Sequence, residues 1–172
     1  VSRSWMVKPE ANKPVLQAYF DKSISGDTVY IASGTYNERD LKVTKKLIII
    51  GMGKPIIDGN NKGEILTITA AGTSIIGLVI QNSGYSGYND IAAVRILNTR
   101  NVSIKNCRLK GNFFAIYCQR SSFCTIEGNT IESNALSEVL SANGIHCWKS
   151  DSLKIRNNKI SGHRDGIYFE FV

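Results

Sequence analysis

Apolar and polar positions alternate in a repeating pattern along the C-terminal half of the chain. Equivalent copies of the pattern occupy residues 93–112, 115–134 and 144–163, and a further copy begins at Gly166. Val94 and Ile116 are 22 residues apart, and so are Ile145 and Ile167, whereas Ile116 and Ile145 are 29 apart. An insertion near 135–142 explains the longer step. A repeat of this length is the signature of a solenoid.

Within each copy, the apolar positions lie two residues apart, which is the spacing of a strand with one buried face. Short strands that stack on their equivalents in the next copy, roughly 4.8 Å away, describe a parallel β-helix. We therefore predict an all-β, right-handed parallel β-helix with coils of about 22 residues. Its predicted inward columns are Val94/Ile116/Ile145/Ile167, Ile96/Cys118/Cys147/Phe169, Val102/Cys124/Leu153, Ile104/Ile126/Ile155 and Leu109/Ile131/Ile160.

Polar residues also recur at equivalent positions. One column holds Asn112, Asn134 and His163, and another holds Cys107, Asn129 and Asn158. Asparagine tolerates left-handed turn geometry, and its amide can bond to a stacked neighbour. We interpret these columns as ladders at the turns; the alternative is a set of solvated loop asparagines.

The N-terminal part predicts a cap. Residues 1–12 have no clear period and are interpreted as a loose lead-in. Asn12 as a cap and Pro14 in the first turn predict a helix over 14–25. Its apolar positions are Val15, Leu16, Tyr19, Phe20 and Ile24, and Gly26 is its stop. We expect this short helix to cover the open end of the solenoid.

The remainder predicts a single domain over residues 1–172. Asp27–Ile31 is the expected first strand, and about six coils follow over 27–172. The strand pattern reaches Val172 without a polar cap, and solenoids need caps at both ends. We therefore expect the sequence to be an N-terminal portion of a longer solenoid.

Composition narrows the function classes only slightly. The chain carries a net charge of +7, but its basic residues are spread along the sequence, which favours an ordinary solvated surface. No basic cluster interleaved with aromatic residues suggests nucleic-acid binding. No apolar run reaches transmembrane length, and no secretory signal is evident. The four cysteines do not have the spacing of a zinc module.

Four segments resemble the NosD family. They are GDTVYIASGTY (26–36), LIIIGMGKPIIDGNNKGEILTI (47–68), ANGIHCWKS (142–150) and GHRDGIYFEFV (162–172). The last is the most specific, whereas the first is common to many β-helix proteins. The resemblance extends from about Val15 to Val172. Family members carry a further His- and Met-bearing run resembling RYGLHFMFS, which is absent here.

The resemblance implies a periplasmic accessory protein for nitrous oxide reductase. Such a protein works with a membrane ABC transporter and a copper chaperone, and the apo reductase is a further potential partner. It helps to supply copper, and sulfur delivery belongs to the same system, while the copper centre of the reductase is assembled. It has no catalytic activity of its own. These expectations come from the resemblance and not from composition or spacing.

Strand alternation predicts which side chains face outward. Ile145 and Cys147 point inward, so His146 and Trp148 point outward, and the same reasoning turns Tyr168 and Glu170 outward one coil later. His146 is then expected beside Tyr168, and Trp148 beside Glu170. Tyr117 continues the His146 column towards the N-terminus.

Copper provides the first hypothesis for this face. Cu(I) favours soft and imidazole ligands, and Cu(II) accepts imidazole with carboxylate oxygen. His146 and His163 are the chain's two histidines. With Glu170 and Asp165 they form the predicted transient copper site. Alternatively, His163 closes the asparagine ladder, His146 is a surface stacker, and the carboxylates pair with Arg164.

The aromatic residues of this face have two interpretations. Trp148, Tyr168 and Tyr117, bordered by Arg164, would suit a partner protein or a sugar ring. Alternatively, they pack laterally under the insertion. Among the cysteines, Cys107 is expected to be the most reachable. A disulfide between stacked Cys118 and Cys147 is conceivable but unfavourable, because their side chains run parallel.

Two other functions compete with copper maturation. A polysaccharide lyase, epimerase or hydrolase on this fold needs clustered carboxylates. Here the acidic residues are scattered, and Asp165 and Glu170 beside Arg164 are the best remnant of such a cluster. The third hypothesis is a scaffold solenoid with neither metal nor catalysis.

Overall fold

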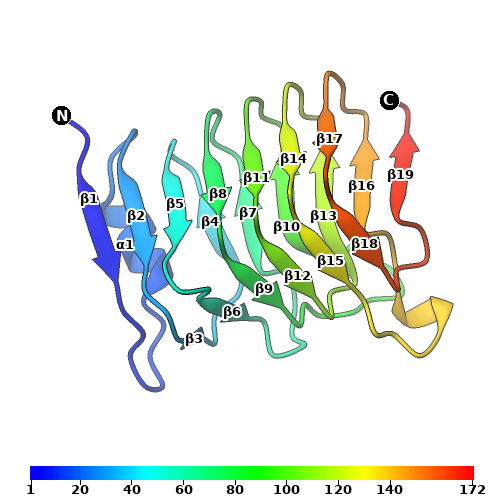
Figure 1. The fold of residues 1–172 in the computed structure, drawn as a ribbon, viewed down its shortest axis with the longest axis horizontal. Helices are drawn as coiled ribbons and strands as arrows, with labels where there is room; N and C mark the ends of the chain where they lie inside the picture. The colour runs from blue at the N-terminus through cyan, green and yellow to red at the C-terminus, as the bar shows by residue number, and fades with distance from the viewer.

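The computed structural model describes residues 1–172 as a coil with three flat sides, each formed by one parallel sheet (Figure 1). Sheet 1 contains β1 (Ser4–Val7), β2 (Thr28–Ile31), β5 (Ile48–Gly51), β8 (Ser74–Ile76), β11 (Ser103–Lys105), β14 (Thr125–Glu127) and β17 (Lys154–Arg156). Sheet 2 contains β3 (Thr35–Tyr36), β6 (Ile56–Asp58), β9 (Val79–Gln81), β12 (Arg108–Lys110), β15 (Thr130–Glu132) and β18 (Lys159–Ser161). Sheet 3 contains β4 (Leu41–Val43), β7 (Leu66–Ile68), β10 (Ala92–Leu97), β13 (Phe114–Gln119), β16 (Ile145–Trp148) and β19 (Ile167–Glu170).

The residues of each predicted inward column pair with one another in the register of these sheets. Val94 pairs with Ile116, which pairs with Ile145, which pairs with Ile167. Ile104 and Leu109 occupy the equivalent positions in sheets 1 and 2. One cluster of 33 buried residues fills the coil along its length, so the hydrophobic core is continuous from coil to coil. The predicted right-handed parallel β-helix is confirmed.

One of the two predicted ladders is present. Asn158 Oδ1 accepts from Asn129 N at 2.9 Å, and Asn129 Oδ1 accepts from Cys107 N at 2.9 Å. The prediction of a ladder through Asn112, Asn134 and His163 is wrong beyond Asn112, because His163 Nδ1 bonds to the carbonyl of Ala142 instead. A serine ladder that sequence reasoning missed lies between sheets 3 and 1. There, Ser121 N donates to Ser150 Oγ at 3.1 Å.

The N-terminus differs most from expectation. Residues 1–12 are not a loose lead-in, because β1 pairs in parallel with β2 along its whole length. Asp27–Ile31 is therefore the second strand and not the first. The helix α1 spans Leu16–Lys22, shorter than the predicted 14–25, because Ser23 turns to extended backbone and its hydroxyl bonds to Tyr19 O. Ile24 lies beyond the helix and is 47% exposed, so it is not part of the apolar face.

The cap of α1 also comes from an unexpected residue. Asn12 makes no capping bond, and the backbone N–H groups of Val15 and Leu16 donate to the Glu38 carboxylate at 3.1 and 2.9 Å. Leu16 and Phe20 are buried, so α1 packs onto the coil as a cap should.

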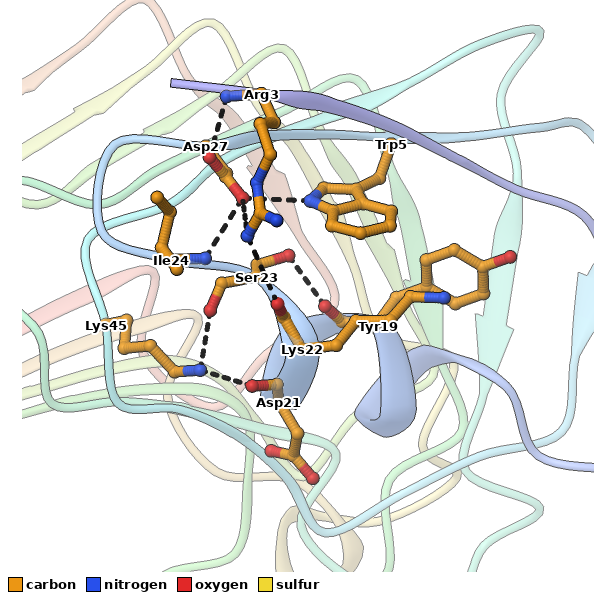
Figure 2. Close-up of polar contacts among 9 residues, drawn as sticks. All are labelled: Arg3, Trp5, Tyr19, Asp21, Lys22, Ser23, Ile24, Asp27 and Lys45. Carbon is orange, nitrogen blue, oxygen red and sulfur yellow. Dashed lines mark hydrogen bonds and ion pairs between the residues drawn. The ribbon is translucent and has the colours of Figure 1, made fainter. Parts of the chain in front are cut away.

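A buried carboxylate joins β1, α1 and β2 (Figure 2). Asp27 accepts from Arg3 N at 2.7 Å, from Trp5 Nε1 at 2.9 Å and from Ile24 N at 3.0 Å. Nearby, Lys45 Nζ bonds to carbonyls at the C-terminal end of α1, including that of Ser23 at 2.7 Å. Hydrogen bonds of side chains therefore hold β1, α1 and β2 together at the N-terminal end of the coil. No helix in the structure has the length and apolar character needed to cross a bilayer.

Candidate functional site

The outer surface of sheet 3 carries a row of stacked rings. Tyr117, His146 and Tyr168 occupy consecutive register positions on β13, β16 and β19. The imidazole lies between the two phenol rings, with centroids 4.5 Å from Tyr117 and 5.2 Å from Tyr168 and interplanar angles of 28° and 23°. The predicted neighbours, His146 beside Tyr168 and Trp148 beside Glu170, are the observed ones.

His146 points away from the coil interior but is buried, with 6% of its surface exposed. A small apolar cluster of Ala92, Phe114, Tyr117 and Ala142 covers the outer face at this point. Phe114 meets the imidazole edge-on at a centroid distance of 5.4 Å. The sequence could not reveal this burial, because Ala142 belongs to the insertion and reaches the sheet only in three dimensions.

The two ring nitrogens of His146 have different surroundings. Asn143 Nδ2 lies 2.8 Å from Nδ1 and donates to it, so the neutral ring carries its proton on Nε2. Nε2 is buried without a hydrogen-bond partner and lies 3.6 Å from Glu170 Oε2. Burial lowers the pKa of His146, while the carboxylates of Asp90 and Glu170 oppose that shift. The imidazole is therefore neutral at pH 7, as metal ligation requires.

His163 shares with His146 a buried Nε2 atom that has no hydrogen-bond partner. Its Nδ1 donates to Ala142 O at 3.1 Å, and its Nε2 is buried with no partner. Burial lowers its pKa, so this ring is also neutral at pH 7. Arg164 contacts Asp165 and Asn143, each at 3.4 Å, and thereby links the turn to the His146 site.

The four predicted copper ligands do not form one cluster. No group of three or more His, Cys, Asp or Glu side chains is arranged to hold a metal ion. His146 and Glu170 are brought together, whereas His163 and Asp165 lie in the turn before β19. Of the four predicted ligands, the structure thus brings together one imidazole and one carboxylate.

The predicted aromatic face is only partly accessible. Tyr117 is buried, and Tyr168 is 42% exposed. Trp148 is half-buried against the apolar cluster, and the cations of Arg120 and Lys149 lie 4.9 and 4.6 Å from its ring centroid. Tyr168 and Arg164 are therefore the members of this set that a partner can reach most easily.

Acidic residues beside the row were missed by sequence reasoning. Glu64 Oε1 pairs with Arg95 Nε at 2.8 Å, and the Arg95 guanidinium lies 4.5 Å from the Tyr117 ring centroid. Asp90 Oδ2 accepts from the Tyr117 hydroxyl at 3.3 Å. Burial, followed by the Asp90 charge, raises the pKa of Tyr117 to about 12. Glu64 and Asp90 lie in turns, where strand periodicity carries no signal.

The cysteines are free thiols in the core of the coil. All four are free and buried, including Cys107, which was expected to be reachable. Cys107 follows the turn but points inward, and burial raises the pKa of its thiol to about 11. Burial likewise raises the pKa of Cys147 to about 12. No disulfide joins Cys118 to Cys147.

Solved structures with a similar fold act on polysaccharides. The catalytic domain of a GH87 α-1,3-glucanase in complex with nigerose matches 95% of this chain and 31% of its own, with 19% identity and a TM-score of 0.75. An alginate lyase from Paenibacillus sp. str. FPU-7 matches 93% of this chain and 58% of its own, with 14% identity and a TM-score of 0.69. An ι-carrageenase complexed to ι-carrageenan fragments matches 90% and 41%, with 16% identity and a TM-score of 0.64. At these identities, the likeness concerns the fold alone.

The chain spans between 31% and 58% of the length of these structures. No curated protein matches the sequence. A family model described as "Periplasmic copper-binding protein (NosD)" matches residues 20–171. This match confirms the resemblance carried by the four segments, and the description agrees with the periplasmic location that it implied. The chain therefore belongs to the NosD family of periplasmic copper-binding proteins.

Proposed function

We propose that this chain is a non-catalytic accessory protein for assembly of the copper centre of nitrous oxide reductase. It acts with a membrane ABC transporter and a copper chaperone, and it holds copper transiently as cargo on the outer face of sheet 3. The observation that carries the proposal is the His146 Nε2 atom, which is buried, unpartnered and 3.6 Å from the Glu170 carboxylate.

The chemistry of this pair suits copper. Imidazole binds both copper oxidation states, and the carboxylate adds an oxygen ligand for Cu(II). Ligation through Nε2 needs the proton on Nδ1, so Asn143 must present its amide oxygen there. Rotation of the amide by half a turn provides this arrangement at the cost of the 3.4 Å bond from Arg164 to Asn143 Oδ1, and it makes Asn143 the outer partner that fixes the ring. The adjacent Asp90 carboxylate favours a cation at this face.

A site with two protein ligands releases its metal readily, which is the property that a delivery step needs. Because burial lowers the pKa of His146 from its usual value of about 6.5, protons compete with the metal only in acid. Copper affinity is therefore expected to stay constant from pH 8 to about 6.5 and to fall below that range.

Catalysis on polysaccharides has no comparable support. The outward carboxylates on the strands have no carboxylate next to them in register; they are Asp58, Glu127, Glu132 and Glu170. Glycoside chemistry needs two carboxyl groups placed together. We therefore propose that the chain has no catalytic activity.

The test is an anaerobic Cu(I) competition titration of the chain and of matched variants. His146→Phe preserves a ring between Tyr117 and Tyr168 but removes the ligand, and it should abolish the binding of one copper. Asn143→Ala leaves the ligands intact and should weaken binding about 10- to 100-fold, the usual cost of losing an outer partner.

His163→Phe is the control, because it removes the other neutral imidazole from the turn. If His146→Phe binds copper as tightly as the parent chain while His163→Phe does not, the site lies at the turn and this assignment is wrong. Unchanged copper affinity in both variants would show that neither imidazole is a copper ligand. Circular dichroism checks that each variant is folded.

A further inference from the structure

Charge is segregated between two edges of the coil. The turns that connect sheet 3 to sheet 1 form a row along the top of Figure 1. In residues 44–47, 69–73, 98–102, 120–124 and 149–153, this row carries five cations and one carboxylate: Lys45, Lys46, Arg100, Arg120, Lys149 and Asp151. We call it the basic turn row.

The turns from sheet 2 to sheet 3 have the opposite sign. They contain the acidic residues Glu38, Asp40, Glu64, Asp90, Glu138 and Asp165, against Arg39, Lys62 and Arg164. The net charge of +7 is therefore not spread evenly over the surface. Stacking of the coils gathers cations from distant parts of the sequence on one edge.

Most cations of the basic turn row have no carboxylate partner. Lys46, Arg100, Arg120 and Lys149 are exposed and take part in none of the ion pairs of the structure. Lys45 is held by carbonyls at the end of α1. Turns of neighbouring coils lie about 4.8 Å apart, and all of these turns except 69–73 carry a cation, so the row produces a positive potential that attracts anions.

A shallow, wide-open groove lies between two of these arginines. It has a volume of about 460 Å³, and its walls include Thr69, Asn98, Arg100, Arg120 and Ser122. Thr99 also lines it, and the Thr99 hydroxyl is buried without a partner. Two guanidinium groups above hydroxyl and amide donors are the groups that recognise a phosphate.

Phe123 supplies an independent observation. It lies on the same row, is 61% exposed, and has a left-handed backbone with φ of 53°. Its register neighbours at this turn are Asn101 and Ser152, small polar residues with φ of 57° and 52°. A bulky side chain in this conformation costs free energy, and an exposed ring gains no packing in return. The stability of the fold does not explain a phenylalanine at this position. We therefore infer that Phe123 acts at an interface.

We propose that the basic turn row docks on an anionic phospholipid bilayer. A lipid phosphate enters the groove between Arg100 and Arg120, and Phe123 inserts at the level of the headgroups. Cations beside an exposed aromatic ring are the combination that binds a membrane surface peripherally. Bilayers border the periplasm, the compartment of this family. The binding is weak and reversible, because it uses no covalent anchor.

Docking along this edge sets the orientation of the whole solenoid. The basic turn row adjoins sheet 3, so sheet 3 stands upright on the membrane with its outer face to the side. This inference does not depend on copper binding, and the two can fail separately.

The test is sedimentation with vesicles of phosphatidylcholine, with and without 30% phosphatidylglycerol. The parent chain should bind only the anionic vesicles, and binding should fall as salt rises. Arg100→Gln with Arg120→Gln should lower partitioning about 25-fold, at about fivefold for each cation near the surface.

A control double variant, Lys110→Gln with Lys159→Gln, removes the same charge from sheet 2. It should change partitioning by less than about threefold, because these residues do not face the bilayer. Equal losses in the two double variants would reduce the effect to net charge and overturn the docking surface.

Phe123→Asn separates docking from folding. Asparagine tolerates the left-handed backbone, so the variant should unfold at a higher temperature than the parent chain. It should nevertheless bind anionic vesicles about tenfold less, through loss of apolar burial. A lower melting temperature would instead make Phe123 a structural residue and contradict the proposal.

Competition with soluble anions identifies the source of the phosphate. Inorganic phosphate should not displace the chain from vesicles at equal ionic strength, because it offers Phe123 no headgroup layer. Tight binding of dextran sulfate without vesicle binding would show that the row recognises an acidic polymer, and the membrane proposal would be wrong.

Discussion

Asp27 shows how much one residue contributes at the N-terminal end. Its carboxylate is completely buried and accepts three hydrogen bonds from two segments: β1 with the residue before it, and the turn that follows α1. Burial by itself raises the pKa, but the hydrogen bonds from Trp5, Ile24 and Arg3 and the Arg3 charge outweigh it and lower the pKa to about 2. The folded state therefore stabilises the ionised form of the Asp27 carboxylate.

This lowered pKa predicts an acid-sensitive end of the coil. A folded pKa below the unfolded value of 3.8 means that the stabilisation is complete above about pH 4 and is lost as pH falls towards 2. Asp27→Asn should lower the melting temperature at pH 7 by roughly 5 °C. Its melting temperature should also change less than that of the parent chain between pH 4 and 2. Thermal unfolding followed by circular dichroism measures both, and parallel pH curves for the two chains would contradict the role of Asp27.

At the scale of the element, α1 depends on a tertiary contact. A helix of seven residues is too short to be stable alone, and its cap comes from Glu38, more than twenty residues away in the sequence. The carboxylate also suits the positive end of the helix dipole. The cap can therefore form only once the first coil has closed.

Removal of this cap should loosen α1 selectively. Glu38→Ala is expected to cost about 1 kcal/mol of stability, as loss of a cap usually does. It should increase hydrogen exchange of the Val15 and Leu16 amides more than that of β10 or β13. Asn12→Gly, which keeps the left-handed backbone at that position, should be neutral within a few tenths of a kcal/mol. Unchanged exchange at Val15 and Leu16 in Glu38→Ala would show that the cap contributes nothing.

At the scale of the whole molecule, each coil contacts only its neighbours, so stability is local along the axis. Ile104 is fully buried at the centre of sheet 1, between Ile75 and Ile126. Ile104→Ala leaves a cavity and should destabilise the chain by about 2 to 5 kcal/mol in urea unfolding. Loss of exchange protection should be largest in β8, β11 and β14 and smallest in β1 and β2. A uniform loss over all coils would indicate a single cooperative unit. Ile155→Ala, at a partly buried position of the same column, should cost less.

The repeat in the sequence determined the coil, its register and the neighbours on the outer face. A period of two within a period of 22 leaves one alignment that buries every apolar column. For this reason His146 beside Tyr168 and the pair Asn129 and Asn158 were predictable. The family followed from the segments 142–150 and 162–172, and the matched residues 20–171 confirm it.

Tertiary structure decided what happens where the period stops. Turns and insertions carry no repeat, so the burial of His146 beneath Phe114 and Ala142 and the cap by Glu38 were invisible in the sequence. For the same reason, the sequence did not show that His163 and Asp165 lie apart from the pair of His146 and Glu170. Charge behaves likewise, because cations that are scattered along the chain become one row only when the coils stack at the strand spacing. Short-range alternation thus specifies the strands and their pairing, whereas contacts between turns, which depend on the closed coil, create the sites.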